Sequence, residues 1–186
     1  DGNPCDDGNA CTMNDLCLGG RCVGGATGGF TESQGSPVAV GTNPRSIAAG
    51  DFNLDGMLDL AVTNTASNSV SILLGNGSGG FTEAQGSPVG TGLYPNSIAV
   101  SDFNLDGRPD LAVVNFDSSS ATILLGNGSG GFAEAAGSPF DAGLNPFYVV
   151  AGDFDLDGKP DLAVASLSSN SLMILLGNGS GGFTEA

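Results

Sequence analysis

Three acidic loops contain the side chains of this chain that are best suited to binding a cation. Residues 51–59 read DFNLDGMLD, and near-copies follow at 102–110 and 153–161. Each loop has oxygen-bearing side chains at positions 1, 3, 5 and 9, and a glycine at position 6 that permits a tight turn. Calcium takes about six to eight hard oxygen ligands, which alternating side chains on such a turn can supply. The loops therefore predict three calcium sites.

The predicted ligands are the side chains at positions 1, 3, 5 and 9 and the backbone carbonyl at position 7. They are Asp51, Asn53, Asp55, Met57 and Asp59; Asp102, Asn104, Asp106, Arg108 and Asp110; and Asp153, Asp155, Asp157, Lys159 and Asp161, with Met57, Arg108 and Lys159 contributing the carbonyl. Only the third loop has a carboxylate at position 3. Because more ligand charge strengthens calcium binding, we expect this loop to bind most tightly.

Solvated acidic turns without a cation are the alternative interpretation of these loops. Three or four carboxylates within nine residues would then repel one another strongly, so we favour bound calcium. The loops do not match an EF-hand, because position 12 holds Val62, Val113 or Val164 where that motif has a bidentate glutamate.

A repeat of 51 residues organises most of the chain. The string ILLGNGSGGF recurs with this period, at 72–81, 123–132 and 174–183. We divide the chain into a disulfide-stapled segment at 1–25 and a β-repeat region at 26–186. The β-repeat region consists of a partial repeat at 26–44 and repeats at about 45–95, 96–146 and 147–186.

Each repeat is predicted to form four short strands. In the first repeat the apolar runs lie at 46–50, 59–64, 69–75 and 80–85, and the Asn-Gly dipeptide at 76–77 is typical of a hairpin. Helical periodicity is absent. Four strands in about 50 residues is the size of a propeller blade, so the expected fold is all-β, with tandem propeller-like blades.

The repeat resembles the FG-GAP/VCBS repeats of integrin α-chain propellers and many bacterial surface proteins. The resemblance covers about residues 28–186 and rests on the acidic loop followed by Leu-Ala-Val, on Gly80-Phe81 and on Gly86-Ser87-Pro88. It implies blades in which a calcium loop joins the first two strands. The sequence departs from the family at Leu54, Leu105 and Leu156, where the family usually has glycine.

The first 22 residues contain all four cysteines, Cys5, Cys11, Cys17 and Cys22. Zinc is disfavoured, because there is no C-x-x-C pair and no histidine. Two disulfides fit better and imply an oxidising, extracellular setting. Three pairings exist, and our working choice is Cys5–Cys17 with Cys11–Cys22. The segment resembles the short DGNxC repeats of secreted bacterial and amoebal proteins.

Asn76, Asn127 and Asn178 each begin an Asn-Gly-Ser sequence, which fits the acceptor pattern for N-glycosylation. An Asn-Gly hairpin tip explains the same residues without any sugar. Both interpretations remain open at this stage.

The charge balance restricts the classes of partner. Four Lys and Arg against 20 Asp and Glu give a formal net charge of −16, which argues against nucleic acid and anionic membranes as partners, because both need clustered cations. No apolar run reaches the roughly 18 residues that a membrane span needs. The chain has no histidine to serve as the usual base of a nucleophilic triad, and its clustered carboxylates are assigned to calcium, so we expect no enzymatic activity.

The expected function is that of an extracellular, calcium-binding structural repeat protein. Because Ala186 ends the sequence inside a repeat, we expect either a longer protein or head-to-tail self-association into a filament. The alternative is a calcium-dependent adhesin or carbohydrate-binding propeller segment. Its candidate contact residues are the aromatic side chains that differ between repeats: Tyr94, Phe116, Phe140, Phe147 and Tyr148.

Overall fold

The structure is a computed structural model that describes residues 16–18, 21–23, 32–33 and 35–186. The chain separates into two compact units, Asp1–Ser36 and Pro37–Ala186. In the first unit, β1 (Leu16–Leu18) pairs antiparallel with β2 (Arg21–Val23), and Cys17 is the register partner of Cys22. Cys5 and Cys11 lie outside the described residues, so the two disulfides and their pairing stay predictions.

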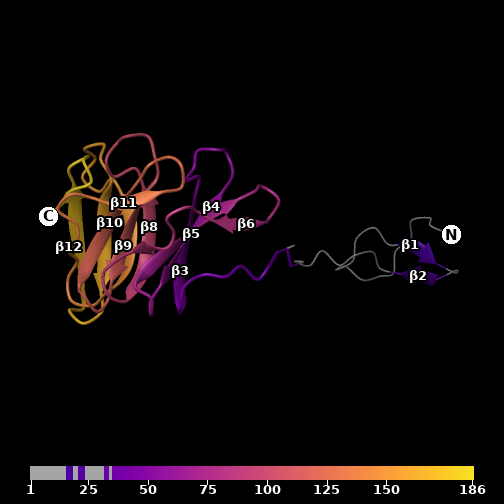
Figure 1. Cartoon of the computed structure of the whole chain (residues 1–186). Coiled ribbons are helices and arrows are strands. Elements are labelled where there is room, and N and C mark those ends of the chain that lie inside the picture. The colour runs from indigo at the N-terminus through magenta and orange to yellow at the C-terminus, as the bar shows by residue number, and fades with distance from the viewer. Residues whose placement is uncertain (1–15, 19–20, 24–31, 34) are drawn as a thin grey trace. The chain divides into compact units, whose positions relative to one another are not determined.

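The second unit is built from three antiparallel sheets, which follow one another along the chain (Figure 1). Blade 1 consists of β3 (Pro44–Gly50), β4 (Asp59–Asn64), β5 (Ser69–Gly75), β6 (Phe81–Glu83) and β7 (Val89–Gly90). Blade 2 consists of β8 (Pro95–Ser101), β9 (Asp110–Asn115), β10 (Ser120–Gly126), β11 (Phe132–Glu134) and β12 (Phe140–Asp141). Blade 3 consists of β13 (Pro146–Gly152), β14 (Asp161–Ser166), β15 (Ser171–Gly177) and β16 (Phe183–Glu185).

Within each blade, four strands pair in chain order, as expected for strands joined by short connections. Blades 1 and 2 add a two-residue strand that the sequence did not predict: β7 pairs with the start of β5, and β12 with the start of β10. The all-β class and the four-stranded repeat unit are therefore confirmed. In the described part of the chain no helix is long and apolar enough to cross a membrane.

The hairpin between the third and fourth strands is fixed by its asparagine. Asn76 Oδ1 accepts hydrogen bonds from the backbone N–H groups of Ser78 and Gly80, at 2.9 and 3.0 Å. Gly77 and Gly79 have φ angles of 69° and 83°, a backbone conformation that residues with a side chain rarely adopt. The Asn-Gly-Ser sequence is therefore used by the turn itself; glycosylation at Asn76, Asn127 and Asn178 stays a prediction.

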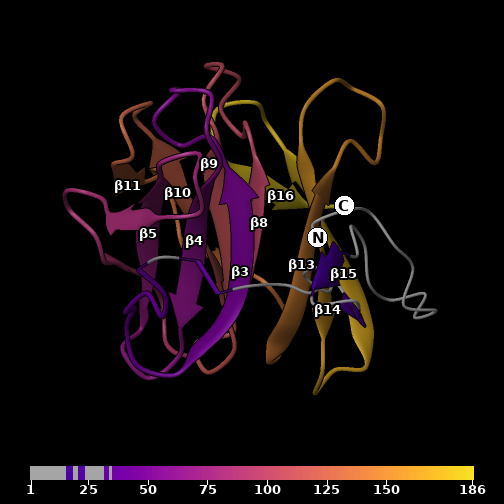
Figure 2. The same ribbon diagram turned by 90° about the vertical axis from the view of Figure 1, so that its right-hand side faces the viewer.

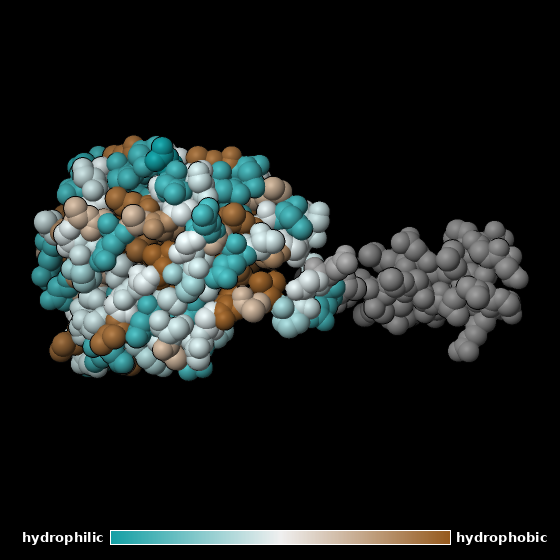
Figure 3. All heavy atoms as spheres, in the orientation of Figure 1, coloured by the Kyte–Doolittle hydropathy of each residue, from teal (hydrophilic) through white to brown (hydrophobic). Residues whose placement is uncertain are grey.

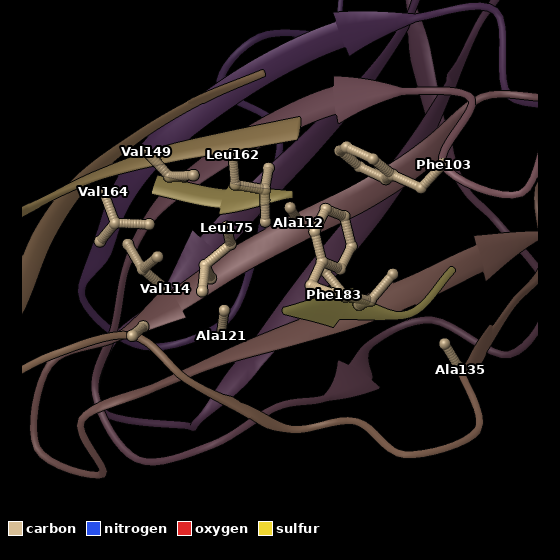
Figure 4. Packing of buried hydrophobic residues seen from close by; sticks show 12 residues of the cluster. Phe103, Ala112, Val114, Ala121, Ala135, Val149, Leu162, Val164, Leu175 and Phe183 are labelled. Carbon is tan, nitrogen blue, oxygen red and sulfur yellow. The ribbon is translucent and has the colours of Figure 1, made fainter. Parts of the chain in front are cut away.

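The blades pack through their first strands and through apolar side chains between the sheets. Figure 2 shows β3, β8 and β13 as neighbours, and β8 contacts both of the others. One apolar cluster lies between blades 1 and 2 and includes Phe52 and Ile72. A second lies between blades 2 and 3 and includes Phe103 and Phe183 (Figure 4). Since each cluster draws on two sheets, neighbouring repeats stabilise one another.

Apolar side chains also reach the surface of the second unit. The face seen in Figure 3 has separate brown groups of hydrophobic residues among teal and white ones. Single exposed hydrophobic residues are ordinary on a protein surface.

Candidate metal centre

Each acidic loop joins the first and second strands of its blade, as the family resemblance implied. The loops lie between β3 and β4, between β8 and β9, and between β13 and β14. All three therefore have the same structural context, and position 9 of each loop is the first residue of the second strand: Asp59, Asp110 or Asp161.

The aspartate at position 9 is fully buried and ties the loop to the sheet. Asp59 Oδ2 accepts a hydrogen bond from the Phe52 N–H at 2.8 Å, and Oδ1 accepts one from the Gly75 N–H, also at 2.8 Å. Asp110 and Asp161 bond to the equivalent groups of their own blades. The carboxylate thus holds position 2 of the loop against the end of the third strand.

Burial has a clear electrostatic consequence at the second loop. Loss of solvation raises the pKa of Asp110 from 3.8 to about 6, although the Gly126 and Phe103 N–H groups favour the charged form. The Asp106 carboxylate adds a smaller increase to this pKa. A cation beside Asp110 would oppose both unfavourable contributions.

The side chains at positions 1, 3 and 5 turn inward and bond to the loop backbone. In the first loop, Asp51 accepts from the N–H groups of Asp55 and Gly56 at 3.0 and 2.8 Å, and Asn53 Oδ1 accepts from Asp55 at 3.1 Å. Asp55 Oδ1 accepts from Met57 at 2.8 Å. The other two loops repeat all four bonds. The oxygen-bearing side chains are therefore positioned by the fold of the loop.

Position 4 is a leucine in the left-handed region of backbone space. Leu54, Leu105 and Leu156 have φ angles of 59°, 58° and 62°. That conformation costs a residue with a side chain about 1–2 kcal/mol. For the first two leucines, the side chain gains a contact with the next blade: Leu54 Cδ1 lies over Gly128, and Leu105 Cδ1 lies over Gly179. This contact is a physical reason for leucine where the family usually has glycine.

The third loop gathers the most negative charge. Asp153, Asp155 and Asp161 bring carboxylate oxygens within 4.8 Å of one another, and they are the one such acidic group in the described part of the chain. The first two loops have the neutral Asn53 and Asn104 in place of Asp155. Oxygens this close are suited to converge on one hard cation.

Cationic side chains beside two of the loops were missed at the sequence level. Lys159 Nζ bonds to Asp157 Oδ2, which lowers the pKa of the Asp157 carboxyl and raises that of the Lys159 ammonium. Arg108 Nη1 lies 3.5 Å from Asp106 Oδ2. The sequence signal for both contacts is a cationic residue two positions after an aspartate.

The donor set of the loops fits calcium. It consists of carboxylate and amide oxygens, which are the hard ligands that calcium prefers. Both oxygens of the position 9 aspartate already accept an N–H, yet a carboxylate oxygen has a further lone pair available for a metal. The predicted carbonyl ligands at Met57, Arg108 and Lys159 belong to the same turns.

The aromatic candidates fall into two places. Tyr94, Phe116, Phe147 and Tyr148 form a continuous row, with ring centroids 6.0, 6.3 and 5.3 Å apart along it. Arg45 Cζ lies 5.3 Å from the centre of the Phe147 ring. Phe140 lies apart from this row and packs against Phe183 at 5.7 Å.

The comparisons with known proteins agree with the loop and blade geometry. A family model described as FG-GAP-like repeat matches residues 51–113 and again residues 102–164. Each match begins at position 1 of an acidic loop and extends into the second strand of the next blade, so the two together include all three loops. No curated protein matches the chain.

Proposed function

Because the chain belongs to the FG-GAP-like repeat family, we propose that it is an extracellular, calcium-binding structural repeat protein with one Ca²⁺ in each acidic loop. The observation that carries this proposal is the approach of the Asp153, Asp155 and Asp161 oxygens within 4.8 Å. The ligands of each loop are the five residues at positions 1, 3, 5, 7 and 9, the seventh through its carbonyl.

Calcium would act on the stability of the blades. The folded loop collects the ligands, whereas an unfolded chain scatters them, so calcium binds the folded state. With a Kd of about 10⁻⁴ M, as in weak extracellular sites, about 10 mM calcium would raise the free energy of unfolding by about 2.7 kcal/mol for each site. The formal net charge of −16 makes this effect larger at low ionic strength.

Calorimetric titration with calcium and thermal unfolding, with and without a chelator, test this role. We expect binding to three sites and a higher Tm with calcium. Magnesium at the same concentration is the control, and it should raise the Tm less because it gives up its water ligands reluctantly. A Tm that calcium leaves unchanged, together with a flat titration, would exclude the proposed sites.

We further propose that the protein assembles head to tail into a filament and has no catalytic activity. Near-identical repeats present near-identical surfaces, which suits regular assembly better than one unique binding pocket. Negative-stain electron microscopy in millimolar calcium, repeated after chelation, tests assembly. Filaments that lose their regularity without calcium support the proposal, and single particles under both conditions contradict it.

An adhesin or carbohydrate-binding segment is the second candidate. It is favoured by the row formed by Tyr94, Phe116, Phe147 and Tyr148, because exposed aromatic rings are suited to stack against sugars. Tyr148 is well exposed and Tyr94 partly so. A glycan array probed with monomeric protein separates the two candidates: specific binding supports the adhesin, and an empty array favours the structural role.

A further inference from the structure

Equivalent residues of the three blades differ sharply in burial. Phe52 and Phe103 are each 1 % exposed, whereas Phe154, at the same position of blade 3, is 48 % exposed. Val70 and Ala121 are 0 % exposed, whereas Leu172 is 64 % exposed. The sequence is hydrophobic at all six positions. Blade 3 therefore exposes an apolar face whose equivalents in blades 1 and 2 are buried.

The internal junctions show what covers such a face. Phe52 packs edge-on against Phe132 of blade 2, and its carbonyl accepts a hydrogen bond from the Gly130 N–H at 2.9 Å. Phe103 makes the same two contacts with blade 3, through Phe183 and Gly181. In both junctions the hairpin and fourth strand of the following blade therefore cover this phenylalanine.

The start of the third strand is covered differently. Val89 and Gly90 of β7 pair with Val70 and Ser69, and β12 pairs in the same register with β10. In blade 3 the equivalent residues are Leu172 and Ser171, both exposed. They line a groove of ≈ 340 Å³ together with Tyr148, Leu167 and Asn170.

Blade 1 has the complementary face. Ile47 is 60 % exposed, whereas its equivalents Ile98 and Val149 are 7 % and 5 % exposed because they face the preceding blade. The hairpin at 76–80 is the equivalent of those that cover Phe52 and Phe103. It has no charged residue, so it would bring no like charge toward an acidic loop.

A segment before β3, residues 37–43, corresponds to the connections that bridge blades 1 and 2 and blades 2 and 3. Its second half is bonded to blade 1: the Gly41 N–H donates to Ser71 Oγ at 3.3 Å and the Thr42 N–H to Ser67 Oγ at 3.1 Å. Gly92 and Leu93 make the equivalent bonds to blade 2. Val38 and Ala39, in the first half, are exposed and belong to no strand.

We propose that a second copy of this chain docks on blade 3 by adding residues 37–43 to the edge of β15. Val38 then pairs with Leu172 and Ala39 with Ser171, the register in which Val89 meets Val70. Blade 1 of the second copy covers Phe154, and its Asn43 N–H reaches Asn170 as the Tyr94 N–H reaches Asn68 Oδ1 at 2.8 Å. This interface rests on the head-to-tail assembly proposed above and specifies the residues that form it.

A charged substitution in the groove tests the interface. We expect light scattering after size-exclusion chromatography in millimolar calcium to show association that rises with concentration. Leu172→Asp should weaken it at least tenfold, because it places a charge at the centre of the added strand pair. The matched control is Leu144→Asp, which changes an equally exposed leucine, 61 % exposed, in the connection between β12 and β13.

A photo-cross-link identifies the partner segment without a destabilising charge. Leu172 is replaced by p-benzoylphenylalanine, and unlabelled chain is mixed with an equal amount of ¹⁵N-labelled chain. We expect the main cross-link to join residue 172 to the 37–43 segment, with links between the two isotopic forms about as frequent as links within one form, as random pairing of copies requires. Cross-links found only within one isotopic form, or mainly to another region, would overturn the interface.

The outcomes separate this interface from the broader function. Chains that bind calcium but stay monomeric at all concentrations overturn both the interface and assembly, and leave the calcium sites standing. Association that Leu172→Asp leaves unchanged overturns the interface alone.

Discussion

The ring of Phe103, in the second acidic loop, packs edge-on against Phe183 of blade 3 with their centroids 5.6 Å apart. The loop that gathers the candidate calcium ligands thus also contributes to the core between blades (Figure 4). Phe103 lies between the candidate ligands Asp102 and Asn104 in the sequence, so we expect calcium binding at this loop to be coupled to packing between the blades.

Phe103→Ala is expected to lower the free energy of unfolding by about 3–5 kcal/mol, because it leaves a cavity between two sheets. Urea unfolding monitored by circular dichroism measures this. The matched control is Phe154→Ala at the equivalent, half-exposed position, where we expect a loss of less than about 1 kcal/mol in dilute monomer. Equal losses of stability for the two variants would show that Phe103 and Phe154 are buried to the same extent in solution.

Asp110→Ala should destabilise the protein even when calcium is absent. It leaves the buried N–H groups of Phe103 and Gly126 without their acceptor, and each unsatisfied group costs about 1–3 kcal/mol. Unfolding in the presence of a chelator measures this contribution by itself. Asp117→Ala, in an exposed turn, is the control and should change little; a stable Asp110→Ala variant would mean that calcium binding is the main role of this aspartate.

Without calcium, stability should fall as the pH rises from about 4 to about 6. The folded state raises the pKa of Asp110 from 3.8 to about 6, so in this window the folded chain holds a proton that the unfolded chain has lost. The stabilisation from the protonated Asp110 carboxyl is fully present below the unfolded-state pKa and is lost above the folded-state pKa. The free energy of unfolding therefore falls by about 3 kcal/mol across this window.

The pH effect is measured by urea unfolding in a chelator at pH 4 and pH 7. Asp110→Asn isolates the contribution of this carboxyl, because the other acidic groups titrate in both proteins. We expect the fall in stability to be about 3 kcal/mol smaller in Asp110→Asn. If both proteins show the same pH dependence, the Asp110 carboxyl has no raised pKa.

Asp155→Asn should weaken calcium binding at the third loop and leave the other two sites unchanged. The substitution removes one of the three carboxylates within 4.8 Å and reproduces the asparagine of the first two loops. Calorimetric titration follows each class of site, and the reciprocal change Asn104→Asp should strengthen the second site. An unchanged titration for both variants would remove position 3 from the ligand set.

The amino-acid sequence alone determined the repeat, the strands and the loops. These features depend on short-range patterns: apolar runs of strand length, Asn-Gly at the hairpins, and alternating oxygen donors around a glycine. Because the pattern recurs every 51 residues, each copy folds in the same local way, and β4 and β5 lie where their apolar runs predict.

Only the tertiary structure decided which of these equivalent residues are buried. Phe52, Phe103 and Phe154 are the same residue in the same local motif, and they differ because a following blade covers the first two. The pairing of β7 with β5 and the two N–H groups held by Asp59 were likewise beyond the sequence. Burial and hydrogen bonding depend on neighbours in space, which a local sequence pattern does not specify.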